Sequence, residues 1–119
     1  MNKVLVICKG TGQSKSFERF MDDYTKKNNL PIEWIYANDK EYLDVIEGGD
    51  VKVAIISPEV VLVEAQIKST LESKNTPYIV IKPADFGLKR VEKFMPDVEK
   101  IYSLIYLRKR WEYGRNLDN

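Results

Sequence analysis

The sequence contains no histidine and a single cysteine, Cys8. Without histidine the chain cannot form a Ser-His-Asp triad, a histidine metal site or a phosphohistidine of its own. With one cysteine it cannot form an internal disulfide, a Cys-x-x-Cys redox pair or a thiolate zinc cage. If the chain has a covalent nucleophile of the usual strong kind, that nucleophile is Cys8.

The chain also lacks an excess of either charge, because 19 Lys and Arg stand against 18 Asp and Glu, for a net charge of +1. That balance gives no electrostatic reason for binding nucleic acid or an anionic membrane surface. The longest apolar runs have four or five residues, far fewer than the ~20 that cross a bilayer. No apolar signal-peptide region follows Met1. We therefore expect a cytoplasmic protein without membrane insertion.

The 119 residues suit one domain with its own core, and no linker, repeat or low-complexity segment divides them. We predict a domain over residues 1–107 and a basic, aromatic extension over residues 108–119. The extension fits either a solvated helix end or a docking element for a partner.

Apolar runs of strand length alternate with amphipathic stretches of helical period along the chain. The predicted strands are residues 3–7, 31–37, 51–56 and 78–81. The predicted helices are residues 16–28, 39–47, 60–71 and 91–105, the last broken or kinked at Pro96. Strictly alternating strands and helices predict a three-layer α/β/α fold, with a four-stranded parallel sheet in the order 2-1-3-4.

In such a sheet ligands bind where the winding reverses, here at the carboxyl ends of the first and third strands. Cys8 ends the first strand, and a candidate phosphate-binding loop follows it: Lys9, Gly10, Thr11, Gly12, Gln13, Ser14 and Lys15. Positive φ angles at both glycines would turn backbone N–H groups inward to bind an oxyanion. The same field, with Lys9 and Lys15, predicts a Cys8 pKa below the ~8.5 of a free cysteine.

Other interpretations of this loop stand beside that one. A lone cysteine at a strand end is often a small buried apolar residue. A dinucleotide fingerprint lacks its third glycine at Lys15, and a Walker loop would need Gly-Lys-Ser/Thr where Ser14-Lys15-Ser16 stands. Low-molecular-weight tyrosine phosphatases and arsenate reductases share a cysteine loop on a similar fold, but place an arginine six residues later. Ser14 occupies that position.

The chain resembles the enzyme IIB component of the lactose/cellobiose/chitobiose class of the bacterial phosphoenolpyruvate-dependent sugar phosphotransferase system (PTS). Lys3–Cys8 resembles the opening strand and its phosphoryl-accepting cysteine, and Met21 matches a family methionine without a gap. Ile55–Val60 resembles the third strand and its Gly-Pro-Gln turn, and Ile79–Gly87 the fourth strand and the segment after it. The similarity spans residues 3–105.

The resemblance implies a phosphoryl relay. Cys8 would accept a phosphoryl group from a phosphohistidine on a partner IIA protein and pass it to a sugar held by the IIC membrane transporter. The fold would be that of the low-molecular-weight tyrosine phosphatases, the protein a monomer, and no metal or organic cofactor would take part. A non-catalytic regulator or adaptor on the same fold, and a cysteine-dependent phosphatase or arsenate reductase, are the alternatives.

The chain departs from the family pattern around the cysteine. Gln13 and Lys15 replace small hydroxyl residues, and Ser57 and Glu59 stand where the family favours Gly and Gln. A carboxylate at position 59 would repel a phosphoryl group unless it faces away from the loop.

Three apolar residues near the loop are candidates for partner docking: Phe17, Val61 and Leu62. Phe17 shares a helical stripe with Met21 and so suits the core as well as a docking surface. Val61 and Leu62 lie off the apolar stripe of the third predicted helix, which favours exposure.

Overall fold

The computed structural model describes residues 1–104 of the chain, so the predicted extension over residues 108–119 lies outside the described residues. Four parallel strands form one sheet in the order β2-β1-β3-β4. Their bounds are Asn2–Ile7 for β1, Ile32–Ala37 for β2, Val51–Ile56 for β3 and Tyr78–Val80 for β4. The predicted α/β fold and strand order are confirmed.

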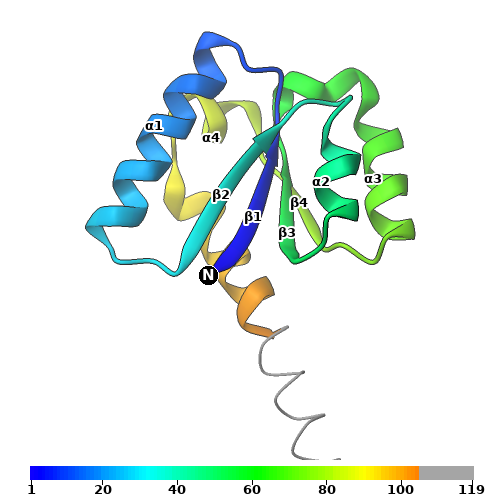
Figure 1. Ribbon diagram of the computed structural model, residues 1–119. Helices are drawn as coiled ribbons and strands as arrows, with labels where there is room; N and C mark the ends of the chain where they lie inside the picture. Colours follow the sequence, from blue (N-terminus) through cyan, green and yellow to red (C-terminus); the bar gives the residue numbers. More distant parts are fainter. Residues whose placement is uncertain (105–119) are drawn as a thin grey trace, which may run out of the picture.

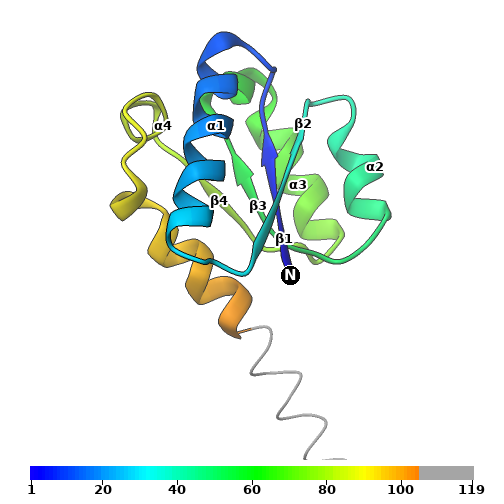
Figure 2. The same cartoon turned by 60° about the vertical axis from the view of Figure 1, so that its left-hand side comes forward.

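Helices cover both faces of the sheet (Figures 1 and 2). One face carries α1 (Gly12–Lys27), α4 (Pro83–Gly87) and the helical residues 95–104, and the other carries α2 (Tyr42–Glu47) and α3 (Glu64–Ser73). Two 3₁₀ helices complete the described chain, η1 (Pro58–Val63) and η2 (Val91–Lys93). None of the helices in residues 1–104 is long and apolar enough to span a membrane.

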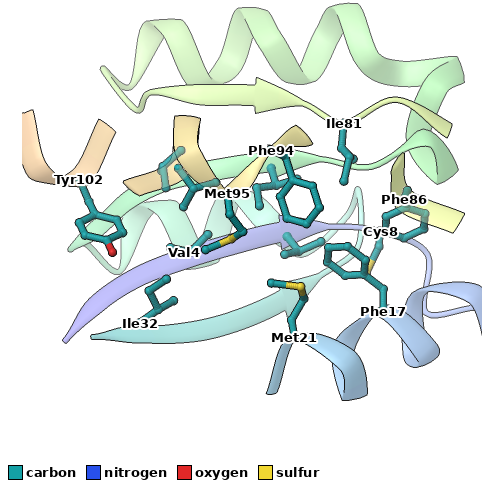
Figure 3. Packing of buried hydrophobic residues seen from close by; sticks show 14 residues of the cluster. Val4, Cys8, Phe17, Met21, Ile32, Ile81, Phe86, Phe94, Met95 and Tyr102 are labelled. Atoms are coloured by element: carbon teal, nitrogen blue, oxygen red, sulfur yellow. The ribbon is translucent and has the colours of Figure 1, made fainter. Parts of the chain in front are cut away.

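The strand β1 is buried on both faces, as its continuous apolar run predicts. Successive side chains of a strand point to opposite faces. Val4, Val6 and Cys8 therefore join the core beneath α1, and Leu5 and Ile7 join the core beneath α2 and α3. Figure 3 shows Val4 and Cys8 in the first of these clusters. This alternation directs the Cys8 side chain toward α1.

The observed helices differ from the predicted ones at several boundaries: α2 begins at Tyr42 rather than residue 39, and α4 was not predicted. The first helix begins at Gly12 rather than residue 16, with Thr11 as its N-cap. The third begins as η1, because Ser57 accepts a hydrogen bond from the Glu59 N–H while Pro58 starts the first turn without a free N–H. The predicted break near Pro96 is present: η2 ends at Lys93, Phe94 is its C-cap, and a new helix over residues 95–104 has Pro96 in its first turn, where proline removes no helical hydrogen bond.

Candidate functional site

Cys8 lies at the carboxyl edge of the sheet, directly after β1. Its backbone N–H donates to the carbonyl of Ala37 at the end of β2, at 3.0 Å. On the other side of β1, the N–H of Ser57 donates to the carbonyl of Ile7 at 3.1 Å. Cys8 and Ser57 therefore end neighbouring strands, and the segments that follow them meet at the switch point of the sheet.

The Cys8 side chain is buried, with 4% of the residue exposed, in the apolar cluster between the sheet and α1. Figure 3 shows it beside Phe17 of α1 and Phe86 of α4. The interpretation of Cys8 as a buried apolar residue is thus correct for its packing. Its position at the start of the loop remains compatible with a role in chemistry.

The loop after Cys8 is short and leads straight into α1. Gly10 has a φ of +75°, a left-handed conformation that favours glycine. Gly12 does not have the predicted positive φ, because it is already the first residue of α1. The N–H groups of the first turn of a helix have no acceptor within that helix and point toward the space before it. They point here toward the edge at which Cys8 lies.

The carboxylate of Glu59 binds this loop. The backbone N–H of Lys9 donates to Glu59 Oε1 at 2.8 Å, and the Thr11 hydroxyl donates to Glu59 Oε2. Thr11 is the N-cap of α1, yet its hydroxyl caps no N–H of that helix. Glu59 thus faces the loop rather than away from it.

Burial raises the pKa of the Cys8 thiol above its ordinary value. The backbone of Gly10 and the side chain of Ser14 lower it by hydrogen bonding, while the negative charges of Glu59 and Glu18 raise it. The prediction that the Cys8 pKa lies below that of a free cysteine was therefore wrong. Desolvation outweighs these two hydrogen bonds, and the negative charge of Glu59 acts in the same direction as desolvation.

Comparisons with known proteins address the fold. No protein-family model matches the chain, and no curated protein matches it by sequence. Among solved structures, it is similar to the lactose-specific IIB component domain of the phosphoenolpyruvate:carbohydrate phosphotransferase system from Streptococcus pneumoniae, with a TM-score of 0.59. The match covers 71% of this chain and 79% of that one, at 17% sequence identity. The chain has the fold of that IIB domain. The resemblance stated from the sequence is confirmed at the level of the fold.

Only part of the predicted phosphate-binding loop is a loop. Lys9, Gly10 and Thr11 connect β1 to α1, whereas Gly12, Gln13, Ser14 and Lys15 form the first turn of α1. Among these four, only Ser14 is buried, and its hydroxyl donates to the carbonyl of Thr11 at 3.1 Å.

Gln13 and Lys15, the two residues of this turn that depart from the IIB pattern, are both exposed. The Gln13 side chain lies against Gly87 of α4, where its Nε2 would be 2.9 Å from a Cβ added at Gly87. Lys15 is exposed on the first turn of α1. Of the polar residues after Gly12, Ser14 is the one close enough to the sulfur to lower the Cys8 pKa, and this effect requires its hydroxyl to turn from the Thr11 carbonyl to the thiolate.

An open hollow of about 160 Å³ lies beside Cys8, on the side of β2 and α2. Its lining comprises Cys8, Lys9, Gly10, Tyr36, Ala37, Asn38 and Glu41. The Tyr36 hydroxyl is buried, and it has no hydrogen-bond partner among the described residues. Within residues 1–104, no three His, Cys, Asp or Glu side chains gather closely enough to hold a metal ion.

The docking prediction for Phe17 was wrong. Phe17 is fully buried, with its ring centroid 4.7 Å from that of Phe86 and 5.7 Å from that of Phe94. It is a core residue because α4 and the segment before the last described helix cover the face that the sequence left open. Val61 and Leu62 are exposed at 63% and 91%, as their place off the apolar stripe predicts.

The sequence identified Cys8 and its loop but missed the direction of Glu59. The available signal was its position two residues beyond Ser57, which follows β3 just as Cys8 follows β1. Carboxyl ends of adjacent parallel strands meet at one edge, so a carboxylate there can reach the loop.

Proposed function

We propose that this chain is a IIB-type phosphocarrier of a bacterial sugar phosphotransferase system. Cys8 accepts a phosphoryl group from a phosphohistidine of a IIA protein and transfers it to a sugar of the lactose, cellobiose or chitobiose type held by the IIC membrane transporter. The protein is then a transferase that works as a cytoplasmic monomer, without a metal or organic cofactor.

One observation carries the proposal: the only cysteine directly follows β1 at the switch point, next to the start of α1, in a chain with the fold of a IIB domain. Donors at a helix start and in a glycine-containing loop bind the oxygens of a phosphoryl group. In-line phosphoryl transfer depends mainly on positioning and charge stabilisation, which such donors provide.

Each of the two phosphoryl transfers forms one bond at phosphorus and breaks another. The sulfur of Cys8 attacks the phosphorus of the donor phosphohistidine, so that an S–P bond forms while the N–P bond breaks. The thiol proton ends on the imidazole nitrogen that leaves, and no oxidant or reductant is needed. The second transfer breaks the S–P bond and forms an O–P bond to a sugar hydroxyl, whose proton is released.

Partner recognition is proposed for the exposed apolar residues of η1. Val61 and Leu62 follow Glu59 by two and three residues, so a partner that covers them also reaches the cysteine loop. A relay needs a brief encounter, which a small apolar contact provides better than a large dry interface.

The test is phosphorylation of the full chain by phosphoenolpyruvate, the general phosphotransferase proteins and a IIA protein. Intact mass spectrometry should show one added phosphate that survives acid and is released by iodine. The Cys8→Ser variant should gain none while keeping its circular dichroism spectrum, because a hydroxyl of similar size is a far weaker nucleophile. Phosphorylation of Cys8→Ser, or none of the wild type with an active donor, would contradict the proposal.

A non-catalytic regulator on the same fold is the second candidate, and the Glu59 carboxylate in the loop favours it. In a protein that never accepts phosphate, the Lys9 N–H and the Thr11 hydroxyl can stay hydrogen-bonded to the Glu59 carboxylate. This candidate predicts no phosphorylation of wild type in the same assay. A cysteine-dependent phosphatase has less support, because Ser14 stands where these phosphatases have an arginine. The Ser14 hydroxyl donates to the Thr11 carbonyl.

A further inference from the structure

Both oxygens of the Glu59 carboxylate are bound to the segment between Cys8 and α1. One accepts the Lys9 N–H at 2.8 Å, and the other accepts the Thr11 hydroxyl. Each contact joins residues about fifty positions apart in the sequence, so neither is a local turn. They connect the segment after β3 to the segment after β1 across the switch point.

These donors belong to the segment that directly follows Cys8, where a phosphoryl group on its sulfur would need hydrogen-bond donors. The Lys9 N–H directly follows the sulfur-bearing residue, and the Thr11 hydroxyl stands at the N-cap of α1. Carboxylate and phosphate oxygens accept charge-assisted hydrogen bonds of the same kind. Two anionic groups in contact repel each other, so the loop cannot bind both at once.

We propose that Glu59 is a built-in competitor for the phosphoryl group: its carboxylate occupies the loop of the resting protein and must turn away before the loop binds phosphate. For the phosphoryl ligand this inference rests on the proposed function. Glu59 thereby keeps free phosphate and similar small anions out of the loop until a phosphoryl donor arrives.

The surroundings of Glu59 allow its carboxylate to leave without unfolding of the segment. Its backbone N–H is held by Ser57 Oγ at 3.3 Å, and Ser57 itself is fully buried. The Glu59 side chain is only half-buried. Rotation about its side-chain bonds therefore frees the two loop donors while η1 keeps its capped start.

The first experiment titrates inorganic phosphate into the folded full chain and follows the Lys9 amide by ¹H–¹⁵N NMR. Glu59→Ala empties both donors, and Glu59→Gln keeps an acceptor without its charge. Glu64→Gln is the matched control, because it removes the same charge from a carboxylate that pairs with Lys68 at 3.2 Å instead of the loop. A thermal melt of each variant checks that it is folded.

The expected order of phosphate affinity is Glu59→Ala above Glu59→Gln, and both above wild type and Glu64→Gln. Glu59→Ala should bind phosphate about tenfold more tightly than wild type, since a charge-assisted contact no longer competes. Equal or weaker phosphate binding by both folded Glu59 variants would overturn the inference, and would mean that the carboxylate organises the donors instead.

The second experiment separates this inference from the proposed function. Phosphoryl uptake from the IIA donor is measured on the same four proteins. Tighter phosphate binding in Glu59→Ala supports the inference even if no protein is phosphorylated at Cys8, a result that would refute only the phosphocarrier function. Phosphorylation of wild type together with unchanged phosphate affinity in both Glu59 variants refutes only the inference.

Discussion

At the scale of single residues, the chemistry of Cys8 depends on opposing influences on its sulfur. Hydrogen bonds from the Gly10 backbone and the Ser14 side chain stabilise the thiolate. The apolar cluster that contains Phe17 and Phe86 excludes solvent from the sulfur and destabilises the thiolate. Burial is the larger influence, and the carboxylate of Glu59 adds to it. The resting protein therefore holds a thiol that is less ionised than a free cysteine at neutral pH.

The pH dependence of Cys8 alkylation tests this balance. Because burial raises its pKa, the thiol stays protonated to higher pH, and the inflection of the iodoacetamide rate should lie above the ~8.5 of a free cysteine. The rate between pH 7 and 8.5 should be lower than that of the urea-unfolded chain. An inflection below that reference would mean that the loop field outweighs burial.

At the scale of elements, one turn of α1 belongs to the site and the next turn belongs to the core. Its first turn ends the cysteine loop and is mostly exposed, and its next turn buries Phe17 against two further aromatic rings. The packing of Phe17 therefore holds the start of α1 in place at the site.

Replacement of Phe17 by Ala should reduce the free energy of unfolding by about 3–5 kcal/mol, because it leaves a cavity among Phe86 and Phe94. Urea denaturation measures this loss. Phe20→Ala is the control on the same helix, since Phe20 is 37% exposed and should cost less. Similar losses for both variants would contradict the core role of Phe17.

The element η1 combines the site with an exposed apolar surface. Leu62→Asp should slow phosphoryl transfer from the IIA protein, because it introduces a charge into the proposed docking contact. Since Leu62 is 91% exposed, the free energy of unfolding should change by no more than about 1 kcal/mol. Stopped-flow or quenched transfer rates and a thermal melt on the same variant measure the two effects.

Ser69→Asp, an exposed substitution on α3, controls for added negative charge away from the loop. Transfer by Leu62→Asp at the wild-type rate would remove Leu62 from the docking surface. A large loss of stability would mean that slower transfer reflects unfolding rather than a lost docking contact.

At the scale of the whole molecule, residues 1–104 form the four-stranded sheet and two apolar clusters. Deletion of residues 108–119 should therefore change the free energy of unfolding by less than about 1 kcal/mol and leave Cys8 phosphorylation intact. Denaturation curves and the intact-mass assay on the shortened chain measure this, and light scattering tests the proposed monomer. Failure of the shortened chain to fold would contradict the predicted domain boundary.

Several features followed from local pattern alone. The strand order follows from the alternation of apolar runs and amphipathic stretches, because parallel strands need right-handed crossovers. The position of Cys8 at the carboxyl edge follows from the same pattern, and so does the exposure of Val61 and Leu62. The start of α1 was missed because the turn from Gly12 to Lys15 has no large apolar side chain, so apolar spacing cannot identify it as helical.

Other features were decided only by tertiary structure, because they depend on residues distant in the sequence. The helical stripe of Phe17 suits a core or a surface equally, and the contacts with Phe86 and Phe94 made it core. The Cys8 pKa depends on how deeply that same packing buries the sulfur. The direction of Glu59 depends on the adjacency of the ends of β1 and β3, which brings its carboxylate to the Lys9 N–H rather than to solvent.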